Sequence, residues 1–367
     1  MSDKSNCVCD RDFDRVYFAA ANTKDGFYSY FDDIFFNPSI KRRYIIKGGP
    51  GTGKSSFMKR VALWAQKKGL EVEYYYCSSD TSSLDGVIID GRVAMLDGTA
   101  PHSYDTVLPG ACDEIINLGD FWNASKLSDS VDDIIRLGAK KREHYSHAYG
   151  YLAAAGKVRE TLDSIIKPCM KWDKMTAAVC RSCDKIKVTD GVRSADRICQ
   201  MTALGTAGEV HFDTLFNLAK ERYLVVDHYG TAPMFLDSLC RRAREVGRSV
   251  WMSLDVVDHR TPTELYFPDS GEYYGICDAD RMTDDDVSLH HINMKRFVDA
   301  ESFSNIRYSY RVGRQAYRSL IDLATYQLSL AGQVHGQIES FYVGAMDFSS
   351  QQRYCTELLR TLEGVLV

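Results

Sequence analysis

The sequence predicts an α/β fold built from two tandem copies of one lobe, in which a mostly parallel sheet is flanked by helices and followed by long helices. Three observations support this prediction. A glycine-rich loop in the first half of the chain lies between a strand pattern and an amphipathic helix pattern. A further strand pattern follows that helix, and the same succession returns in the second half. The 367 residues are enough for two domains of ordinary size, which we expect at residues 1–190 and 191–367.

The loop of the first copy is a complete Walker A phosphate-binding motif. Gly48, Gly53, Lys54 and Ser55 match the spacing G-x-x-x-x-G-K-[ST] in full. In such a loop the backbone N–H groups and the start of the next helix hold phosphate oxygens. The lysine reaches the β- and γ-phosphates, and the hydroxyl binds Mg²⁺. The first copy is therefore a predicted P-loop NTPase lobe, and its predicted phosphate-binding residues are Gly48, Gly49, Pro50, Gly51, Thr52, Gly53, Lys54, Ser55 and Ser56.

The flanking residues supply the context that this motif needs. Residues 44–46 have the apolar pattern of the end of a buried strand, and Phe57, Val61 and Trp64 recur at the spacing of one helix face. Gly69 is a typical residue for ending that helix, and residues 72–77 are expected to form the next strand. A strand, the loop, a helix and a second strand make a βαβ unit, and the motif indicates phosphate binding only in this structural context.

The chain repeats itself once. Residues 223–231 resemble residues 44–52 at an offset of 179 residues. Further matches follow in the same order at offsets of 176 to 178, namely Gly69 with Gly247, residues 116–121 with 292–297, and residues 155–158 with 331–334. Matches in one order at nearly one offset are the pattern of an internal duplication.

The second copy has lost the residues that bind phosphate. Ala232, Pro233 and Met234 stand where the first copy has glycine, lysine and serine. Proline has no N–H group to offer a phosphate, and methionine is not a ligand for Mg²⁺. Asp227, at the position of the first glycine, would repel phosphate oxygens. We therefore expect a second lobe without nucleotide that supports the first lobe, completes its site or binds a protein partner.

A nucleoside triphosphatase also needs a carboxylate that holds Mg²⁺ through water at the end of a neighbouring apolar strand. Residues 93–97 fit this Walker B pattern, so Asp97 is a predicted catalytic and metal-binding residue together with Lys54 and Ser55. Asp90, after a shorter apolar run, is the alternative. No acidic residue directly follows Asp97, although many related ATPases carry a glutamate there to orient water. Fast hydrolysis would need a base from elsewhere in the chain.

Asp80 is the third candidate catalytic residue. It lies at the expected carboxyl end of the second strand, the edge where ligands bind in open α/β sheets, so its carboxylate could act as a base. A turn cap among the hydroxyl residues 78–83 is the slightly favoured alternative. His102 could sense a γ-phosphate, but a structural histidine is the commoner case. Arg241 and Arg242 could act as arginine fingers, but a solvated helix face explains them better.

The composition limits the classes of partner. A net charge of −5 argues against a protein that mainly coats nucleic acid. The basic segment 140–187 contains Tyr145, Tyr149 and Tyr151, which could stack on bases, but interspersed acidic residues favour a solvated helix face. No uncharged apolar run is long enough to span a bilayer, and no signal peptide pattern is present. We expect no membrane association and no main role in nucleic-acid binding.

The chain has 11 scattered cysteines, an odd number that favours reduced thiols and a cytoplasmic location over a disulfide framework. Cys180 and Cys183, with Cys169 and Cys199, could supply four thiolates to zinc. Their irregular spacing, without a second C-x-x-C pair, favours free thiols instead.

Residues 46–55, residues 77–80 with 84–87, and residues 97–102 also carry a family resemblance. They resemble an uncharacterised bacterial family of cytoplasmic ATPase-like proteins with two P-loop lobes in one chain, and the resemblance extends over most of the sequence. It implies nucleotide binding and little more. Members of that family have a second intact P-loop, and this chain departs from them at residues 232–234.

Together these residues predict an ATP-binding P-loop NTPase that hydrolyses ATP with Mg²⁺ and relays the change to its trailing helices. GTP is disfavoured because the sequence has no N-K-x-D motif. Two alternatives stay open. One is a kinase-like phosphotransferase in which Asp80 is the base, and the other is a non-catalytic nucleotide sensor or interaction module.

Overall fold

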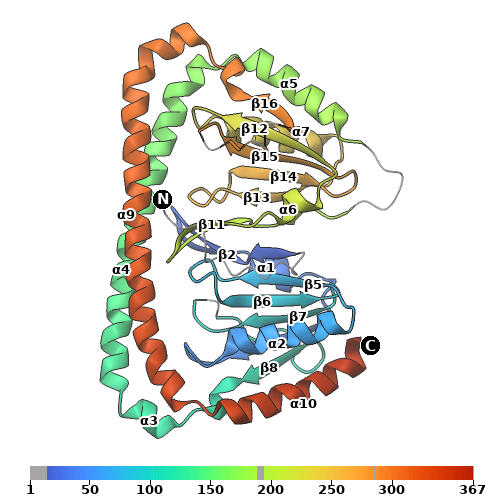
Figure 1. Cartoon of the computed structure of the whole chain (residues 1–367), viewed down its shortest axis with the longest axis vertical. Helices are drawn as coiled ribbons and strands as arrows, with labels where there is room; N and C mark the ends of the chain where they lie inside the picture. Colours follow the sequence, from blue (N-terminus) through green and yellow to red (C-terminus); the bar gives the residue numbers. More distant parts are fainter. Residues whose placement is uncertain are drawn as a thin grey trace.

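The structure, a computed structural model, describes residues 15–366 apart from residues 102, 188–193, 281, 284–285 and 287. The predicted boundary between residues 190 and 191 lies outside the described residues. Two lobes, each with its own six-stranded sheet, stand one above the other beside a pair of long helices (Figure 1). We call the lobe with the first sheet lobe 1 and the lobe with the second sheet lobe 2.

The sheet of lobe 1 is mostly parallel. Only β6 runs antiparallel to its two neighbours. In spatial order the strands are β1 (Val16–Phe18), β5 (Val72–Tyr76), β6 (Leu84–Ile89), β7 (Val93–Asp97), β4 (Arg42–Lys47) and β8 (Asp113–Asn117). All the residues of β5 and β6 are buried, as expected for strands of a sheet that is covered on both faces.

The sheet of lobe 2 has the same spatial order and the same strand directions. Its strands are β9 (Arg197–Ile198), β13 (Trp251–Leu254), β14 (Pro262–Phe267), β15 (Glu272–Asp278), β12 (Glu221–Asp227) and β16 (His290–Asn293), and only β14 is antiparallel to its neighbours. The registers agree as well, since Arg42 pairs with Val93 in lobe 1 and Glu221 pairs with Glu272 in lobe 2. The prediction of two α/β lobes with mostly parallel sheets is thus confirmed.

Each sheet carries one amphipathic helix directly after the strand that lies second from one edge, β4 in lobe 1 and β12 in lobe 2. In lobe 1 this helix is α2 (Lys54–Lys67), which buries Phe57, Val61 and Ala65 against the sheet. Gly69 follows it with a φ of +77°, a conformation that glycine adopts without the strain that other residues meet. In lobe 2 the equivalent helix is α7 (Ala232–Glu245), which has a proline in its first turn. Smaller elements complete each lobe: β2 (Ala20–Thr23), β3 (Gly26–Ser29), α1 (Phe31–Phe35), η1 (Leu118–Phe121) and α3 (Ala124–Ser128) in lobe 1, and β10 (Thr202–Gly205), β11 (Gly208–His211), α6 (Thr214–Leu218) and η3 (Met294–Phe297) in lobe 2.

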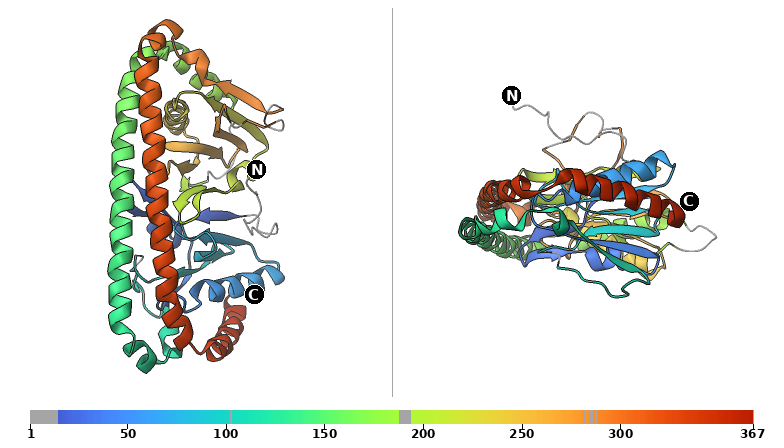
Figure 2. Two further views of the ribbon diagram at one scale, coloured as in Figure 1. Left: turned by 60° about the vertical axis from the view of Figure 1, so that its left-hand side comes forward. Right: turned by 90° about the horizontal axis from the view of Figure 1, so that it is seen from below.

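The long helices connect the lobes by crossing between them. α4 (Val131–Ile166) and α9 (Ala300–Ala345) lie side by side in opposite directions along both lobes (Figures 1 and 2). α4 begins at lobe 1 and ends at lobe 2, where the next helix, α5 (Trp172–Lys185), packs on α7. α9 runs the other way, and α10 (Phe348–Leu366) packs on α2 and η1 of lobe 1. Each half of the chain therefore supplies the last helix of the other lobe.

The lobes also meet directly. Two hairpin tips make matching contacts, because the Lys24 N–H donates to Val257 O and the Thr206 N–H donates to Ser79 O, both at 2.9 Å. The Arg197 guanidinium binds the buried Glu73 carboxylate across the interface at 2.6 and 2.9 Å. One hydrophobic cluster includes core residues of both lobes. The lobes are therefore parts of one packed body.

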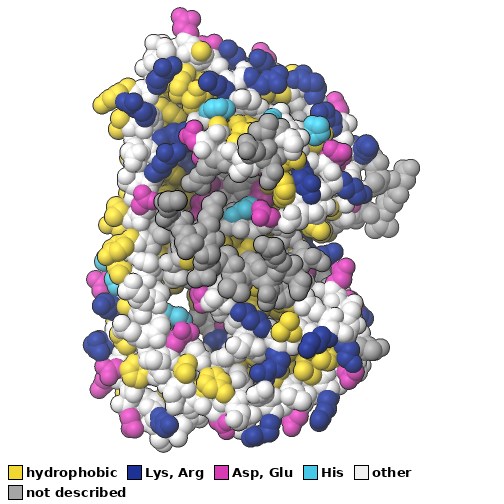
Figure 3. All heavy atoms as spheres, viewed as in Figure 1, with side chains coloured by type: hydrophobic (Ala, Val, Ile, Leu, Met, Phe, Trp, Pro, Cys, Tyr) yellow, Lys and Arg dark blue, Asp and Glu magenta, His cyan; other side chains and the backbone are white. Residues whose placement is uncertain are grey.

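None of the described helices is long and apolar enough to cross a membrane. On the face shown in Figure 3, acidic and basic side chains are interspersed over both lobes. The described part of that face has no unbroken basic stripe of the kind that tracks a nucleic-acid backbone.

Candidate functional site

The glycine-rich loop of lobe 1 lies at the carboxyl end of β4, between two parallel neighbours, β7 and β8. It joins β4 to α2, as the sequence predicts, and faces α9. Gly51 and Gly53 have φ values of +68° and +82°. Other residues pay about 1–2 kcal/mol for this left-handed backbone, so the loop can take this shape readily only with glycine at both positions.

Lys54, the first residue of α2, folds back over the loop. Its ammonium donates hydrogen bonds to the carbonyl oxygens of Gly48 at 3.0 Å and Gly49 at 2.8 Å. It also lies 3.5 Å from Oδ2 of Asp97. The Thr52 hydroxyl donates to Gly49 O at 2.8 Å and fixes the loop from inside. The predicted lysine is therefore held beside the loop by contacts that phosphate oxygens could replace.

Asp97 ends β7, the strand next to β4, and so reaches the same edge of the sheet. Its Oδ1 accepts hydrogen bonds from the N–H of Thr99 at 2.9 Å and from the Thr99 hydroxyl at 2.5 Å. Burial raises the pKa of Asp97, and the charge of Lys54 opposes that rise. The alternative, Asp90, lies in the turn between β6 and β7, at the amino end of β7 and so at the far end of the strand from Asp97. Its carboxylate pairs with Arg92 at 2.9 Å. The structure brings Asp97, and not Asp90, to the lysine.

Two further predicted residues, Ser55 and Ser56, lie in the first turn of α2. The Ser55 hydroxyl accepts a hydrogen bond from the Leu84 N–H at 2.9 Å, whereas Ser56 is exposed. A serine hydroxyl and a carboxylate are hard oxygen ligands, and Mg²⁺ prefers such ligands together with water and phosphate oxygens. Ser55 and Asp97 therefore fit a Mg²⁺ that is bound mainly by a nucleotide.

Asp80 lies in the loop after β5, where the sequence places it. Its carboxylate accepts hydrogen bonds from the Ser82 N–H at 3.0 Å and the Ser82 hydroxyl at 2.8 Å. These are the contacts of the turn cap that was the favoured alternative. The charge of Asp80 also acts to raise the pKa values of Glu339 and His335. Its role as a base stays a prediction.

The far end of the chain covers the loop. A Cβ atom at Gly51 would lie 3.0 Å from the backbone oxygen of Glu339 and 2.9 Å from Cγ2 of Val343, both on α9. From α10, the Gln351 side chain donates to Thr52 O at 2.9 Å, a contact between residues 299 positions apart. Sequence reasoning missed these residues because no local pattern joins the end of α9 to the loop.

The residues that α4 and α9 present to the loop are titratable. His335 lies 3.6 Å from the Glu339 carboxylate and 3.3 Å from the Lys141 ammonium. Burial, followed by the charges of Lys141 and Lys54, lowers the pKa of His335 to about 4. Burial and then Asp80 raise the pKa of Glu339, while a hydrogen bond from the Gly51 backbone acts against the rise. Glu339 therefore supplies an acidic group near the loop, where no glutamate follows Asp97.

The loop of lobe 2 has a different arrangement. The Asp227 carboxylate accepts hydrogen bonds from the N–H groups of Tyr229 at 3.1 Å and Thr231 at 3.0 Å. From α9, the Tyr310 hydroxyl donates to Tyr229 O, and Arg314 donates to His228 O at 2.6 Å. Two backbone amides that could face a phosphate are therefore already bound to the loop's own carboxylate.

The two candidate arginine fingers form ion pairs on the surface of α7. Arg241 and Arg242 are exposed on α7, where they pair with Asp237 at 2.9 Å and Glu245 at 3.1 Å. These are the pairs expected of a solvated helix face. His102 lies outside the described residues.

The cysteine and tyrosine clusters do not form sites in the described structure. Cys180 and Cys183 lie on α5, and no group of three or more His, Cys, Asp or Glu residues in the described part of the chain could hold a metal ion. Tyr145 and Tyr149 stack at 6.0 Å, and the Tyr149 hydroxyl donates to Asn22 at 3.0 Å. Because these rings pack between α4 and the lobes, they are not free to stack on bases.

The site in lobe 1 is thus defined by its geometry: the loop, Lys54, Ser55 and Asp97 meet at one sheet edge beneath α9. The family resemblance stays a prediction. No protein-family model, curated protein or solved structure matched the chain.

Proposed function

We propose that lobe 1 binds ATP with Mg²⁺ and hydrolyses it, and that the long helices respond to the bound nucleotide. The observation that carries the proposal is the position of the Lys54 ammonium. Two loop carbonyls hold it 3.5 Å from Asp97, in a loop whose sequence is a full Walker A motif. Phosphate oxygens that enter the loop would replace the two carbonyl oxygens as hydrogen-bond acceptors for this ammonium.

Each residue then has a defined task. The loop amides and Lys54 neutralise the phosphates, while Ser55 and Asp97 hold Mg²⁺, directly and through water respectively. The ion would draw charge away from the transferring phosphate. Glu339 is our candidate for orienting the attacking water, because burial raises its pKa and its carboxylate lies beside the Gly51 backbone.

We also propose that the two lobes arose by duplication of one P-loop lobe. The shared strand order, strand directions and register support this, together with the sequence matches at offsets of 176 to 179 residues. Lobe 2 is the copy without nucleotide chemistry, since Asp227 binds its own loop amides. Because every cysteine in the described residues is a free thiol, we place the protein in the cytoplasm.

A response of the helices follows from the contacts of α9. Its end lies against the loop of lobe 1 through Glu339 and Val343, and its beginning binds the loop of lobe 2 through Tyr310 and Arg314. Phosphates entering lobe 1 would compete with Glu339 for the Gly51 backbone and so change how α9 packs.

The second candidate function is a nucleotide sensor that does not hydrolyse. The observation that favours it is the cover of α9 and α10 over the loop, which nucleotide entry would have to disturb. A kinase-like phosphotransferase with Asp80 as base has less support, because Ser82 already engages that carboxylate.

One experiment separates these functions. Phosphate release from ATP and Mg²⁺ is followed with the full chain, with Lys54→Ala, and with Lys67→Ala as a matched control on the exposed last turn of α2. We expect release by the wild type, a loss of about 100-fold or more in Lys54→Ala, and a change within about twofold in Lys67→Ala. Equal release by wild type and Lys54→Ala would contradict the proposal. ATP binding without release would favour the sensor, and phosphate appearing on an added metabolite would favour the phosphotransferase.

A further inference from the structure

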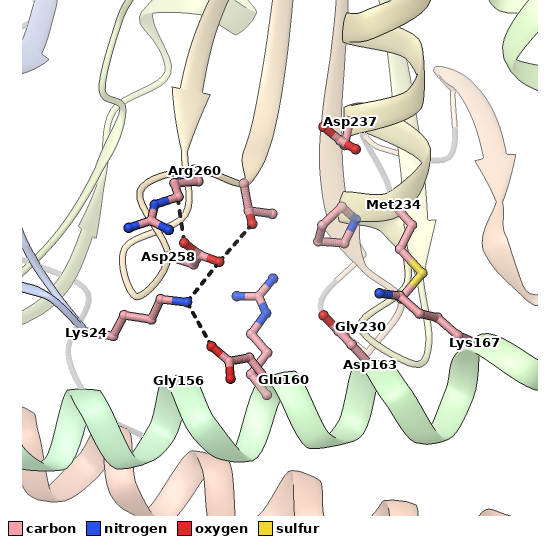
Figure 4. Close-up of a pocket in the computed structure, with 13 residues that line it drawn as sticks. Lys24, Gly156, Glu160, Asp163, Lys167, Gly230, Met234, Asp237, Asp258 and Arg260 are labelled. Carbon is pink, nitrogen blue, oxygen red and sulfur yellow. Dashed lines mark hydrogen bonds and ion pairs between the residues drawn. The ribbon is translucent and has the colours of Figure 1, made fainter.

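A pocket of about 300 Å³ lies in lobe 2, beside the loop that has lost its phosphate chemistry (Figure 4). α4 forms its floor, and the tip of the β2–β3 hairpin, the loop after β13 and the start of α7 form its walls. We propose that this pocket binds a small zwitterion of the size of a free amino acid. The inference goes beyond nucleotide binding in lobe 1 and does not depend on it.

The pocket occupies the position that the nucleotide site has in lobe 1. Asp258, which lines it, closes the same turn as Asp80, since the Thr261 N–H donates to Asp258 O and the Ser83 N–H donates to Asp80 O. The pocket is not a second phosphate loop, because Pro233 has no N–H group and Asp227 already binds two amides of its loop. Any ligand here must be held mainly by side chains.

The side chains around the pocket have changed accordingly. Four basic residues line it, and each stands where the matching element of lobe 1 has an uncharged residue or a histidine. The pairs are Lys24 and Thr206, Arg159 and His335, Lys167 and Val343, and Arg260 and Ser82. In the same comparison the loop lysine, Lys54, has become Pro233. In lobe 2 the basic side chains are therefore on the walls of the pocket, whereas in lobe 1 the loop itself carries the lysine.

The pocket is nevertheless not a site for a polyanion, because four carboxylates line it as well: Glu160, Asp163, Asp237 and Asp258. On one side of the pocket these side chains form ion pairs with each other, since the Lys24 ammonium lies 3.3 Å from both the Glu160 and the Asp258 carboxylates (Figure 4). Equal numbers of acidic and basic side chains complement a ligand that carries both signs.

The other side of the pocket holds the charges that are available to a ligand. Asp163 on α4 and Lys167, the residue directly after α4, are about one turn apart, and in the described structure neither side chain forms an ion pair within 4.0 Å (Figure 4). Burial raises the pKa of Asp163 although the charges of Arg159 and Lys167 act to lower it, so a further cationic group in direct contact with its carboxylate would be favourable. Arg159 is fixed nearby by its 2.6 Å contact with Asp255. An ammonium on Asp163 and a carboxylate on Lys167 would complete this arrangement.

The size and the remaining wall agree with this ligand. A volume of about 300 Å³ is at the lower limit for small-molecule sites, so the ligand is small. Met234 and Pro233 replace the polar residues of lobe 1 at the start of α7, and they provide an apolar surface beside Lys167 for the ligand's carbon atoms.

The test uses the full chain and the common L-amino acids as probes, each measured by isothermal titration calorimetry and by the shift in thermal unfolding midpoint. Butylamine and butyrate serve as probes with only one of the two charges. We expect at least one amino acid to bind with a Kd of about 1 mM or lower, and both single-charge probes to bind at least about tenfold more weakly. Asp163→Asn and Lys167→Gln should each weaken binding about tenfold or more.

Matched substitutions on the exposed face of α4, Asp132→Asn and Lys140→Gln, should leave the affinity unchanged. Lys167 is exposed at the end of α4, so Lys167→Gln is expected to fold normally even if Asp163→Asn does not. The proposal is overturned if no amino acid binds, if butylamine or butyrate binds as tightly, or if Lys167→Gln binds like the wild type. Loss of binding in Lys54→Ala but not in Lys167→Gln would place the ligand in lobe 1 and would also overturn it.

Discussion

The loop after β4 in lobe 1 and the loop after β12 in lobe 2 share a left-handed glycine but differ in the groups that bind them. Gly51 and Gly230 both have a left-handed backbone, with φ values of +68° and +73°. In lobe 2 the Asp227 carboxylate belongs to the loop itself and accepts two of its amides. In lobe 1 the carboxylate that is hydrogen-bonded to the Gly51 backbone, Glu339, comes from a helix of the other half of the chain. The loop of lobe 2 is closed by its own residue, whereas the loop of lobe 1 is covered by residues of α9.

If the two loops arose by duplication of one phosphate loop, as we propose, this difference explains how the second copy keeps its shape without phosphate. An internal carboxylate binds the amides permanently, so the loop remains stable without phosphate. A carboxylate on a separate helix binds only while that helix is in place, so phosphate can compete with it. The loops also differ in packing, since α9 and α10 lie against the glycines of lobe 1 and leave more space at Gly230.

The largest effect is expected from a matched pair of glycine substitutions. Gly51→Ala would place a Cβ atom 2.9 Å from Val343 and 3.0 Å from the backbone oxygen of Glu339, while Gly230→Ala would meet only the Tyr310 hydroxyl, at 3.9 Å. Both substitutions cost about 1 kcal/mol for the left-handed backbone. The crowding adds about 2 kcal/mol at Gly51 alone, so its total is about 3 kcal/mol.

The measurement is the free energy of unfolding in urea for the two variants and the wild type. Equal losses for both variants would mean that α9 does not press on the loop of lobe 1 in solution. The comparison between the loops would then rest on Asp227 alone.

The local patterns predicted the parts of the fold that depend on neighbouring residues. The succession β4, loop, α2, β5 and its return in lobe 2 could be predicted because strands, helix faces and glycine turns leave short-range signals. The packing of α5 and α10 on the opposite lobes could not be predicted in this way. An amphipathic helix shows that it has an apolar face, but its sequence does not say which of two similar lobes covers that face.

The same limit divides the residues of the site. Lys54 and Asp97 were predicted because a motif and a strand end place them, and the structure brings them to 3.5 Å. Glu339 and Gln351 were not predicted. The contact of Gln351 with the loop joins residues 299 positions apart, and such a contact leaves no periodic pattern in the sequence. The sequence did show that a base was missing after Asp97, which is the signal that could have prompted a search for a distant carboxylate.

The next effect concerns the carboxylate that covers the open loop. If Glu339 orients the attacking water, Glu339→Gln should slow phosphate release about 100-fold, while the Kd for ATP changes by less than about threefold. The amide keeps the size of the side chain and removes the charge, so packing against Gly51 should persist. The measurements are single-turnover phosphate release and equilibrium nucleotide binding.

Glu301→Gln is the matched control, because Glu301 is an exposed glutamate in the first turn of the same helix. It should behave like the wild type in both measurements. A Glu339→Gln variant that binds ATP more tightly and releases phosphate at the normal rate would show that Glu339 only covers the loop. The contrast between the lobes would then be one of regulation and not of catalysis.

The smallest effect is a pH dependence that arises at His335, a position that lobe 2 fills with Arg159. His335 faces Lys141 from α4, Lys54 and Asp80 from lobe 1, and Glu339 on its own helix. Burial and the two lysines lower its pKa to about 4 from an ordinary value of 6.5. Between these values the unfolded chain binds more protons than the folded chain, so the free energy of unfolding rises with pH across that window. The contribution is fully present above pH 6.5 and is lost as the pH falls toward 4.

Because 40% of the His335 side chain is exposed to water, we expect this contribution to be only about 1 kcal/mol. His335→Gln should remove it, so the variant should lose about 1 kcal/mol less than the wild type when urea unfolding is compared at pH 7 and at about pH 4.5. The matching residue in lobe 2 is Arg159, which keeps its charge throughout this range, so lobe 2 has no such dependence at that position. An equal loss in variant and wild type would mean that His335 is not held among these cations, and that α9 lies farther from the loop in solution.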